Sequence, residues 1–484
     1  MNSIILRSKS ILFTGIVLFL LISPLVLNGQ SQSPLYQRAP TVLDGTLPEM
    51  RQTSYWIGRM EKPDEVVMQQ ADILKMNQAY NQKMKDMIAG NTLPNTVTRQ
   101  FQSFPGRIAT RPDLSVKTSE ELAVIARDMI NTELKYLRGK PYGNIQGIPY
   151  DAAELDELAD EMAVEGIKNQ ITIRDGITVK YSRLRIIPAL RDEYIGLSDI
   201  KKTRWDMWNL DIVPAGSHVE VVHISKSGGH LFVLTDRGYG WMRSEEVAFD
   251  KKSAILEFCQ SKNFLVCTGD MVPYYSGEDC QIVSGLIRMG DRLPAGSGNN
   301  PAKIKVPTRK LDGKLLIQEA WLAKNADVHA GYVPYTRKNV VELSFKLMDN
   351  LYDWTGGWYG RNHITQLRDC FRCFGFEFPA IGELLAMFND NGWTIAPDKG
   401  KEVQYKAMFS NEPFLTIQIS SGHSQLYLGE EKGEPYVFDT HGYGYTNPDG
   451  AEYEIRRTCI GNLTQPAYFL KNPIYFVTIN NQKK

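Results

Sequence analysis

The sequence predicts a multi-domain α+β protein. Before residue 170, apolar residues recur at helical spacing and capping residues mark helix starts. From 170 to 335, short stretches alternate apolar and polar residues between glycine turns, which is typical of small β-barrels. After 335, helices come first and strands follow, an order that favours an α+β domain over a doubly wound one. We therefore divide the chain into a leader (1–29), a helical N-terminal segment (30–169), two small β-barrels (170–250 and 251–335) and an α+β domain (336–484).

The leader predicts export. Arg7 and Lys9 precede the apolar run ILFTGIVLFLLISPLVL, and small and polar residues follow near Gly29, which is the order of a signal peptide. Pro24 breaks the run, and the run is barely long enough to span a bilayer, so an uncleaved anchor is the less favoured alternative. We expect the mature chain in the periplasm or outside the cell, with no membrane contact once the leader is removed.

The charge balance argues against a nucleic-acid partner. The chain has 484 residues, with 55 basic and 55 acidic side chains, and so lacks the basic excess that phosphate backbones attract. Nothing in the sequence indicates a cofactor. Six cysteines in a chain of this length do not make a disulfide scaffold. Cys259 and Cys267 lie close enough in sequence to pair, Cys280 and Cys459 are further candidates, and the spacing leaves the connectivity open.

The N-terminal segment contains three predicted helices. In the first, Asp64 is placed to cap a helix that continues to about Ile88 with one apolar face. Thr118 and Glu121 stand at the spacing of a capping box before the second. The third is acidic and ends at Gly166. This spread-out arrangement indicates a segment that extends around other parts of the chain.

The last domain should begin with an amphipathic helix over 337–352. A second helix is expected in WYGRNHITQLRDCFRCFGF (358–376), and a third over 380–392. Strands should follow, including one that starts at SGHSQLYLG and one at YVFDTHG.

In order, these parts resemble the NlpC-type, papain-like cell-wall peptidases that carry two bacterial SH3-like domains. The resemblance rests on YWIGRMEKPDEVVMQQADILKMN in the helical segment, on SRLRIIPALRDEY and HVEVVHISKSGGHLFVLTDRGYGW in the first barrel, and on MVPYYSGEDCQIVSGLIRMGDRLPA and GYVPYTRKNVVELSF further on. It implies that the two barrels are SH3-like and that the last domain has a papain-like α+β fold. Active members of the family cleave the peptide stem of peptidoglycan between γ-D-glutamate and the diamino acid.

The family's catalytic positions are only partly kept. Its members use a cysteine at a helix N-terminus, a histidine base at the start of a strand, and a third polar residue that orients the base. Here YDWTGG (Tyr352–Gly357) resembles the loop before the helix, and the count then places His363 where the cysteine should be, between Asn362 and Ile364. His423 matches the base. Asp439 matches the third position without a gap, and His441 would match it only after a two-residue shift.

These substitutions predict that peptidase activity is lost. An imidazole cannot replace a thiolate in forming an acyl-enzyme from an unactivated amide. Ala380, Ile381 and Gly382 also stand where the family has polar substrate contacts. Two alternatives stay open for an active hydrolase: a displaced nucleophile, or a metal held by His363, His423 and Asp439.

Cys370 and Cys373 are poor replacements for the nucleophile. Cys370 lies about 10 Å along the helix axis from position 363, beyond the roughly 3 Å that a nucleophile and its base need. We expect both cysteines to be buried helix residues.

The same resemblance suggests which residues contact a ligand. Trp354 and Asn362 flank the degenerate site, and Tyr239 and Trp241 match a strand that faces the cleft in the family, although core packing explains Trp241 equally well. The resulting hypothesis is an exported, catalytically inactive protein that binds a peptidoglycan stem peptide or cell-wall fragment, or a protein partner.

Overall fold

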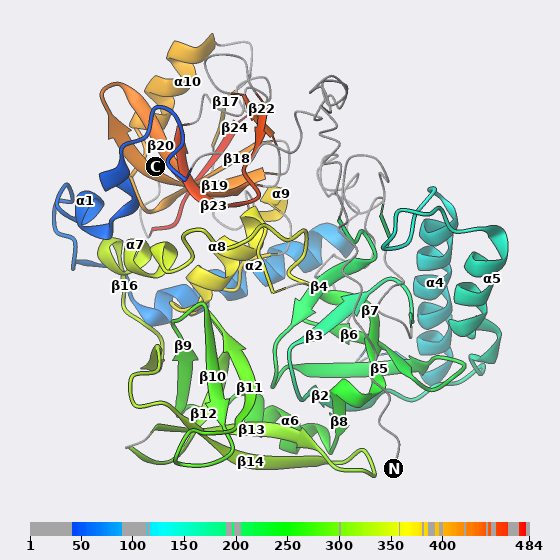
Figure 1. Cartoon of the computed structure of the whole chain (residues 1–484). Coiled ribbons are helices and arrows are strands. Elements are labelled where there is room, and N and C mark those ends of the chain that lie inside the picture. The colour runs from blue at the N-terminus through cyan, green and yellow to red at the C-terminus, as the bar shows by residue number, and fades with distance from the viewer. Residues whose placement is uncertain are drawn as a thin grey trace, which may run out of the picture.

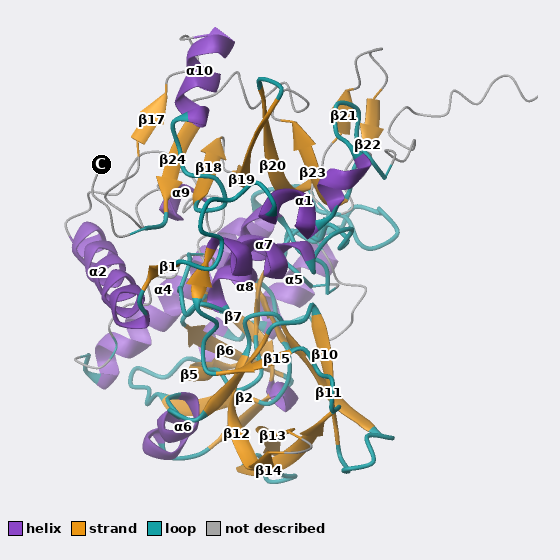
Figure 2. Cartoon of the chain, turned by 90° about the vertical axis from the view of Figure 1, so that its left-hand side faces the viewer, coloured by secondary structure: helices purple, strands orange, loops and turns teal. Residues whose placement is uncertain are grey.

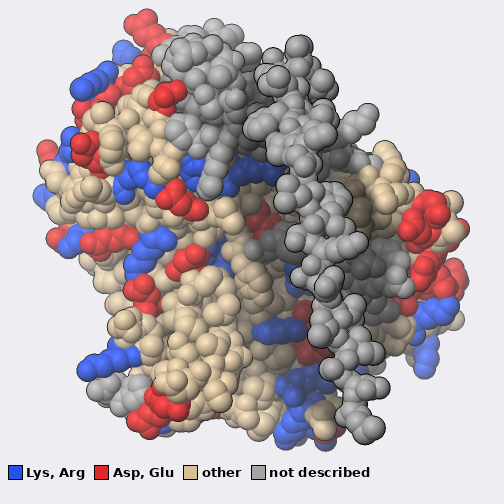
Figure 3. Space-filling view, viewed as in Figure 1, with Lys and Arg blue, Asp and Glu red and all other residues tan. Residues whose placement is uncertain are grey.

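The computed structural model describes residues 41–89, 114, 117–189, 196–197, 205–299, 302–357, 359–379, 382–385, 393–395, 400–420, 423–441, 444–446, 452–462 and 474–480. The predicted leader lies outside these residues. Within them, no helix combines the length and the apolar character needed to cross a bilayer. Acidic and basic side chains are interspersed over the face seen in Figure 3, which agrees with the balanced composition.

The N-terminal segment is helical but contacts two different parts of the molecule (Figure 1). The 3-10 turn η2 (Pro48–Arg51), α1 (Thr53–Ile57) and α2 (Gln70–Ala89) pack on the C-terminal domain, where Trp56 and Tyr80 join its core. Helices α4 (Ser119–Arg138) and α5 (Ala152–Glu161) pack on the first β unit instead. The segment therefore extends over other units, as the spread of its helices indicates.

The helix boundaries follow local capping signals where no distant partner intervenes. The predicted capping box of Thr118 and Glu121 is present at the start of α4. The third helix is shorter than predicted, because α5 ends at Glu161. Ala163 then adopts a left-handed conformation, and a separate 3-10 turn, η4 (Val164–Gly166), follows it.

The prediction that Asp64 caps the first long helix is wrong. Residues Val66–Met68 form strand β1, which pairs with β16 (Tyr335–Thr336), and α2 begins only at Gln70. The Asp64 carboxylate instead accepts from Lys338 Nζ at 3.1 Å. A long-range strand pairing has replaced the helical turn that the local sequence favours.

The first β unit is a seven-stranded antiparallel sheet in the order β4-β3-β7-β6-β5-β2-β8. Its strands are β2 (Arg174–Thr178), β3 (Ser182–Arg185), β4 (Asn209–Val213), β5 (His218–Ile224), β6 (His230–Thr235), β7 (Gly238–Arg243) and β8 (Val247–Phe249), and the turn η5 (Ser244–Glu246) precedes β8. One face of the sheet packs with α4 and α5 around Trp208, Phe232 and Trp241. The second core of this unit is aliphatic and centres on Val219 and Val233.

The second β unit repeats this plan after the short helix α6 (Lys252–Cys259). Its sheet has the order β11-β10-β14-β13-β12-β9-β15. The strands are β9 (Phe264–Cys267), β10 (Met271–Tyr275), β11 (Val283–Arg288), β12 (Arg292–Asn299), β13 (Ala302–Arg309), β14 (Leu315–Leu322) and β15 (Val328–Ala330). The boundary predicted between residues 250 and 251 falls between β8 and α6.

The C-terminal domain places helices before a six-stranded antiparallel sheet of order β17-β24-β18-β19-β20-β23. Its helices are α7 (Arg337–Phe345), α8 (His363–Arg372), α9 (Gly382–Leu385) and α10 (Gly400–Phe409). Its strands are β17 (Trp393–Ile395), β18 (Thr416–Ser420), β19 (His423–Glu431), β20 (Glu434–His441), β23 (Arg457–Asn462) and β24 (Ile474–Thr478), with β21 (Gly444–Thr446) and β22 (Glu452–Glu454) as a separate hairpin. The first helix is shorter than predicted and ends at Phe345.

Helix α8 lies between the six-stranded sheet and the two β units (Figures 1 and 2). Buried ion pairs connect it to both units. Arg368 forms a bidentate pair with Asp211 of β4, at 2.6 and 2.7 Å. Asp369 accepts from Arg288 Nε of β11 at 2.5 Å and from Arg361 Nε at 2.9 Å. All five side chains are buried, so the position of α8 is fixed by contacts from three parts of the chain.

All six cysteines are free thiols. The pairing of Cys259 with Cys267 that the sequence spacing allowed is not formed. The molecule is held together by packing, strand pairing and buried ion pairs.

Candidate functional site

The N-terminus of α8 presents His363 as its first residue. Asn362 is the N-cap, and its Oδ1 accepts from the backbone N–H groups of Ile364 and Thr365 at 3.1 and 2.8 Å. Thr365 Oγ1 in turn accepts from Asn362 N at 2.8 Å, which completes a capping box. The Asn362 amide also donates to the carbonyl oxygen of Trp354 and so ties the preceding loop to the helix start. This cap fixes the direction in which His363 leaves the helix.

His423 and Asp439 form a buried pair on neighbouring strands, β19 and β20. His423 Nε2 lies 2.9 and 2.8 Å from the two carboxylate oxygens of Asp439. Gln425 Nε2 donates to the same carboxylate at 2.8 Å. Burial alone would raise the pKa of Asp439, but the His423 ring outweighs burial, and the pKa is lowered to about 2. Asp439 is therefore a carboxylate that holds the His423 ring in place.

His363 reaches this pair. The centroids of the His363 and His423 rings are 4.4 Å apart, with an angle of 42° between the ring planes. The backbone N–H of Ser424 donates to His363 Nδ1 at 3.1 Å. A nitrogen that accepts a hydrogen bond carries no proton, so neutral His363 has its proton on Nε2. The structure thus brings His363, His423 and Asp439 together in one chain of contacts.

Comparisons with known proteins agree with this geometry at the level of the fold. No protein-family model matches the sequence, and no curated protein matches it. An NlpC/P60 endopeptidase from Photobacterium damselae subsp. piscicida superimposes with a TM-score of 0.66 at 15% identity, covering 89% of this chain and 97% of that one. The chain has the NlpC/P60 endopeptidase fold. An NlpC/P60 family protein from Bacillus cereus aligns over 62% of this chain and 97% of its own, at 17% identity and a TM-score of 0.43.

In this NlpC/P60 fold, Asp439 is the residue that contacts the His423 ring nitrogen. His441, the other candidate for the third position, is also buried, and its ring centroid lies 5.4 Å from that of His423. Because Asp439 approaches Nε2 of His423, the other ring nitrogen, Nδ1, is on the opposite side of the ring. The pair is therefore arranged as a histidine oriented by a carboxylate.

Cys370 of α8 and Cys373, the residue that caps the C-terminus of this helix, are both unactivated thiols. Cys370 is 1% exposed, and its sulfur lies 3.3 Å from the Ser344 hydroxyl. Burial raises the pKa of the Cys370 thiol to about 12. Cys373 is fully buried and donates to the carbonyl oxygen of Cys267 at 3.3 Å. Both are neutral thiols in the core, as expected, because a reactive thiolate requires exposure and nearby positive charge.

The contacts of the three central residues do not favour a metal site. His423 Nε2 faces the carboxylate of Asp439, and His363 Nδ1 accepts a backbone N–H, so two of the donor atoms that a metal would need already bind protein groups. In the described part of the chain, the side chains whose ligand atoms all lie within 4.8 Å of one another are Asp175, His218 and Glu220. Lys252 Nζ lies 3.2 Å from the Glu220 carboxylate, where it supplies the positive charge itself.

The four predicted ligand contacts differ in their placement. Trp354 is half-buried and stacks on Trp205, with ring centroids 5.1 Å apart and an angle of 11°. Tyr239 is half-buried against the core of the first β unit. Asn362 is 2% exposed and is occupied by the helix cap. Trp241 has no exposed surface and packs in the core of the first β unit.

Two contributors to the site were missed in the sequence. Gln425 binds the Asp439 carboxylate, and its position two residues after His423 on one strand, hence on the same face, was a usable signal. Trp205, which stacks on Trp354, comes from the first β unit, and no local pattern connects the two.

Proposed function

We propose that this chain is an exported cell-wall protein of NlpC/P60 type that binds peptidoglycan stem peptide or a related fragment without cleaving it. The observation that carries the proposal is an imidazole, His363, at the helix start where the fold would otherwise present a thiol. The base and its carboxylate are next to it, with ring centroids 4.4 Å apart for His363 and His423.

The chemistry of the site supports binding and argues against peptide cleavage. Amide hydrolysis by this fold needs a thiolate that attacks the carbonyl carbon and a histidine that shuttles the proton. Here the thiols of α8 are buried and protonated, and His423 has an imidazole neighbour with no acidic proton comparable to that of a thiol.

The rest of the chain fits the same proposal. We assign the two seven-stranded units to SH3-like domains that frame the ligand, within the boundaries 170–250 and 251–335, and the papain-like domain to 336–484. Trp354 and Tyr239, both half-buried, are the proposed ligand contacts besides His363. The alternative ligand is a protein partner bound at the His363 site, in which case the chain would be a regulatory protein.

A cleavage assay with a gain-of-function variant tests the proposal. The purified chain is incubated with L-Ala-γ-D-Glu-diaminopimelate, and released diamino acid is measured alongside calorimetric binding. We expect binding without release. His363→Cys restores a thiol at the helix start beside His423, where the helix dipole and the imidazole favour the thiolate, and should produce measurable release. His441→Cys is the matched control, because it also places a thiol near His423 but away from the helix N-terminus, and it should stay inactive.

The outcomes separate the alternatives. Turnover by the unmodified chain would overturn the proposal. If that turnover required added zinc and disappeared in His363→Ala, the metal alternative would be established. Failure to bind the tripeptide, with no turnover, would remove the stem peptide as the ligand. Turnover by His363→Cys together with binding by the unmodified chain would establish a peptide site that lacks only its nucleophile.

A further inference from the structure

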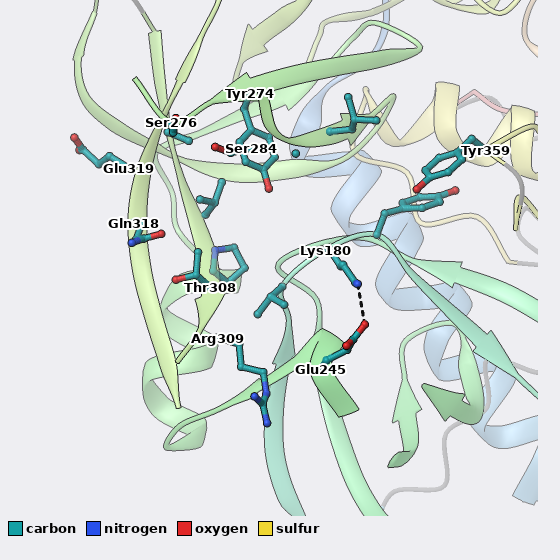
Figure 4. Close-up of a pocket in the computed structure, with 17 residues that line it drawn as sticks. Lys180, Glu245, Tyr274, Ser276, Ser284, Thr308, Arg309, Gln318, Glu319 and Tyr359 are labelled. Atoms are coloured by element: carbon teal, nitrogen blue, oxygen red, sulfur yellow. Dashed lines mark hydrogen bonds and ion pairs between the residues drawn. The ribbon is translucent and has the colours of Figure 1, made fainter. Parts of the chain in front are cut away.

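A cleft of about 690 Å³ lies between the two β units, and neither His363 nor His423 lines it (Figure 4). Its floor is one face of the second sheet, formed by the adjacent strands β10, β14 and β13. Residues two apart on a strand point to the same face. Three pairs of lining residues have this spacing: Tyr274 and Ser276, Gln318 and Ala320, Val306 and Thr308. Pro307, Arg309 and Glu319, which alternate with them, line the cleft as well. The edge strand β11 adds Ser284 and Leu286 at one side.

An aromatic pair forms the opposite wall. Tyr359, labelled in Figure 4, stacks on Tyr181, with ring centroids 5.6 Å apart and an angle of 19° between the ring planes. The Tyr181 hydroxyl is bound by Arg288, which is itself paired with Asp369 of α8. The wall is therefore attached to the buried ion pairs that hold the helix.

Tyr359 has a conformation that packing alone does not explain. Its φ is +68°, in the left-handed region, where a residue other than glycine is strained by about 1–2 kcal/mol. Yet 54% of its side chain is exposed, so burial offsets little of that strain. A large aromatic side chain held at a strained position with an open face is typical of a ligand contact.

The charges along the cleft compensate one another. Lys180 Nζ lies 3.4 Å from Glu245, and Glu319 lies 3.7 Å from Lys303 and binds Ser297. The guanidinium of the fourth charged residue, Arg309, donates from Nε to the carbonyl oxygen of Val247. Two positive and two negative side chains line the cleft, so it has no excess of charge that would select a phosphate or a polyanion.

The face of the second sheet, unlike its edge strand β11, is not where an extended peptide would add. Peptides that bind sheets add to an exposed edge, where backbone N–H and C=O groups are open. Here the backbone groups of β13 and β14 are used between the two strands along Lys303–Arg309, and the cleft lies over the face of the sheet. A ligand that lies over this face meets hydroxyl and amide side chains and an aromatic ring. The exposed hydroxyl and amide groups are those of Ser276, Ser284 and Gln318.

We propose that this cleft binds a neutral oligosaccharide, with one sugar ring packed on Tyr359. The C–H face of a pyranose is apolar and packs on an aromatic ring, while its hydroxyl groups both donate and accept hydrogen bonds, as serine and glutamine side chains do. The cleft volume falls within the roughly 300–1,000 Å³ typical of ligand sites at domain boundaries. The inference goes beyond the proposed function, because a different cleft and a different class of ligand are involved.

The test is a calorimetric titration of the full chain with chitotetraose, cellotetraose and maltotetraose. We expect at least one of them to bind. Tyr359→Gly removes the ring while keeping a residue that accepts the left-handed backbone, and should weaken binding at least about tenfold, as loss of a central aromatic contact typically does. Tyr359→Phe should restore it. Tyr275→Ala is the matched control, because Tyr275 is the neighbour of two floor residues but does not line the cleft, and its affinity should stay within about twofold.

Three results would overturn the proposal: no binding of any of the three sugars, unchanged affinity in Tyr359→Gly, or displacement of the bound sugar by L-Ala-γ-D-Glu-diaminopimelate. The last would mean that the peptide occupies this cleft. A thermal unfolding scan of each variant separates lost binding from lost folding. If Tyr359→Gly does not fold, Gln318→Ala, on the floor of the cleft, replaces it as the test variant. An affinity of Gln318→Ala equal to that of the unmodified chain would then overturn the proposal.

Discussion

Replacing Asp369 by asparagine should destabilise the molecule far more than a single lost surface charge would. Asp369 lies at the centre of the buried contacts that hold α8, 2.5 Å from Arg288 Nε and 2.9 Å from Arg361 Nε. Burial alone would raise the pKa of Asp369, but Arg288 and then Arg361 outweigh burial and hold the pKa well below its usual range. The side chain is therefore ionised in the folded protein at any ordinary pH.

The loss of stability depends on which of the two arginines keeps another negatively charged partner. Arg361 keeps its ion pair with Asp270. Arg288 keeps the carbonyl oxygen of Gly360 at 2.9 Å and the Tyr181 hydroxyl, but among the described residues no other carboxylate lies within 4.0 Å of its guanidinium. One buried cation loses its counter-ion, which costs about 3 kcal/mol, the low end for a broken buried pair. At roughly 2–4 °C per kcal/mol for a unit of this size, the midpoint of thermal unfolding should fall by about 6–12 °C.

Differential scanning fluorimetry of the full chain measures this shift. The matched control is Asp160→Asn, which breaks a pair of the same length, 2.5 Å to Lys226 Nζ, but with side chains 66% and 62% exposed. Exposed pairs contribute about 0–1 kcal/mol, so the control should shift by no more than about 4 °C. Equal shifts in the two variants would refute the reasoning, because burial is the property that distinguishes the two pairs.

Two further predictions concern Asp439, beside His423, and Cys370 of α8. The folded pKa of Asp439, about 2, is below its unfolded value of 3.8, so its ionisation stabilises the fold by about 2 kcal/mol above pH 4 and this contribution is lost as the pH falls toward 2. The difference in unfolding midpoint between the unmodified chain and Asp439→Asn should be constant from pH 7 to 5 and shrink below pH 4; a difference that grows on acidification would contradict this. Cys370, with its pKa raised to about 12 by burial, should resist a thiol-reactive disulfide at pH 8 until the chain is unfolded, whereas the half-buried Cys280 reacts first. Rapid labelling of Cys370 in the folded chain would reopen the displaced-nucleophile alternative.

Local signals in the sequence were sufficient where a structure depends on neighbouring residues. The capping box of Thr118 and Glu121 is such a case, because both hydrogen bonds close within one turn. Asp64 shows the limit. It precedes a convincing helical pattern, but Val66–Met68 pairs with Tyr335–Thr336, and no local pattern reports a partner so distant in the chain.

At the His363 site, too, some contacts were expected from the sequence and others were not. The resemblance to the family led us to expect His363, His423 and Asp439 in one place, and in the structure these side chains are neighbours. The buried ion pairs could not be predicted this way. Arg368 has the sequence context of an ordinary solvent-facing residue of an amphipathic helix, and its partner, Asp211, belongs to another unit.

The loop from Tyr352 to Arg361 lies between the His363 site and the cleft of the β units. An isolated bridge between its two ends closes it at the base, next to α8. Trp354 lies on the side of the degenerate site, where its carbonyl oxygen binds the cap residue of α8, and Tyr359 lines the cleft between the β units. Stability does not account for the conformation of Tyr359, because a left-handed tyrosine with an exposed ring is strained. The two sites for which we propose a ligand, the His363 site and the cleft lined by Tyr359, therefore lie on either side of this loop.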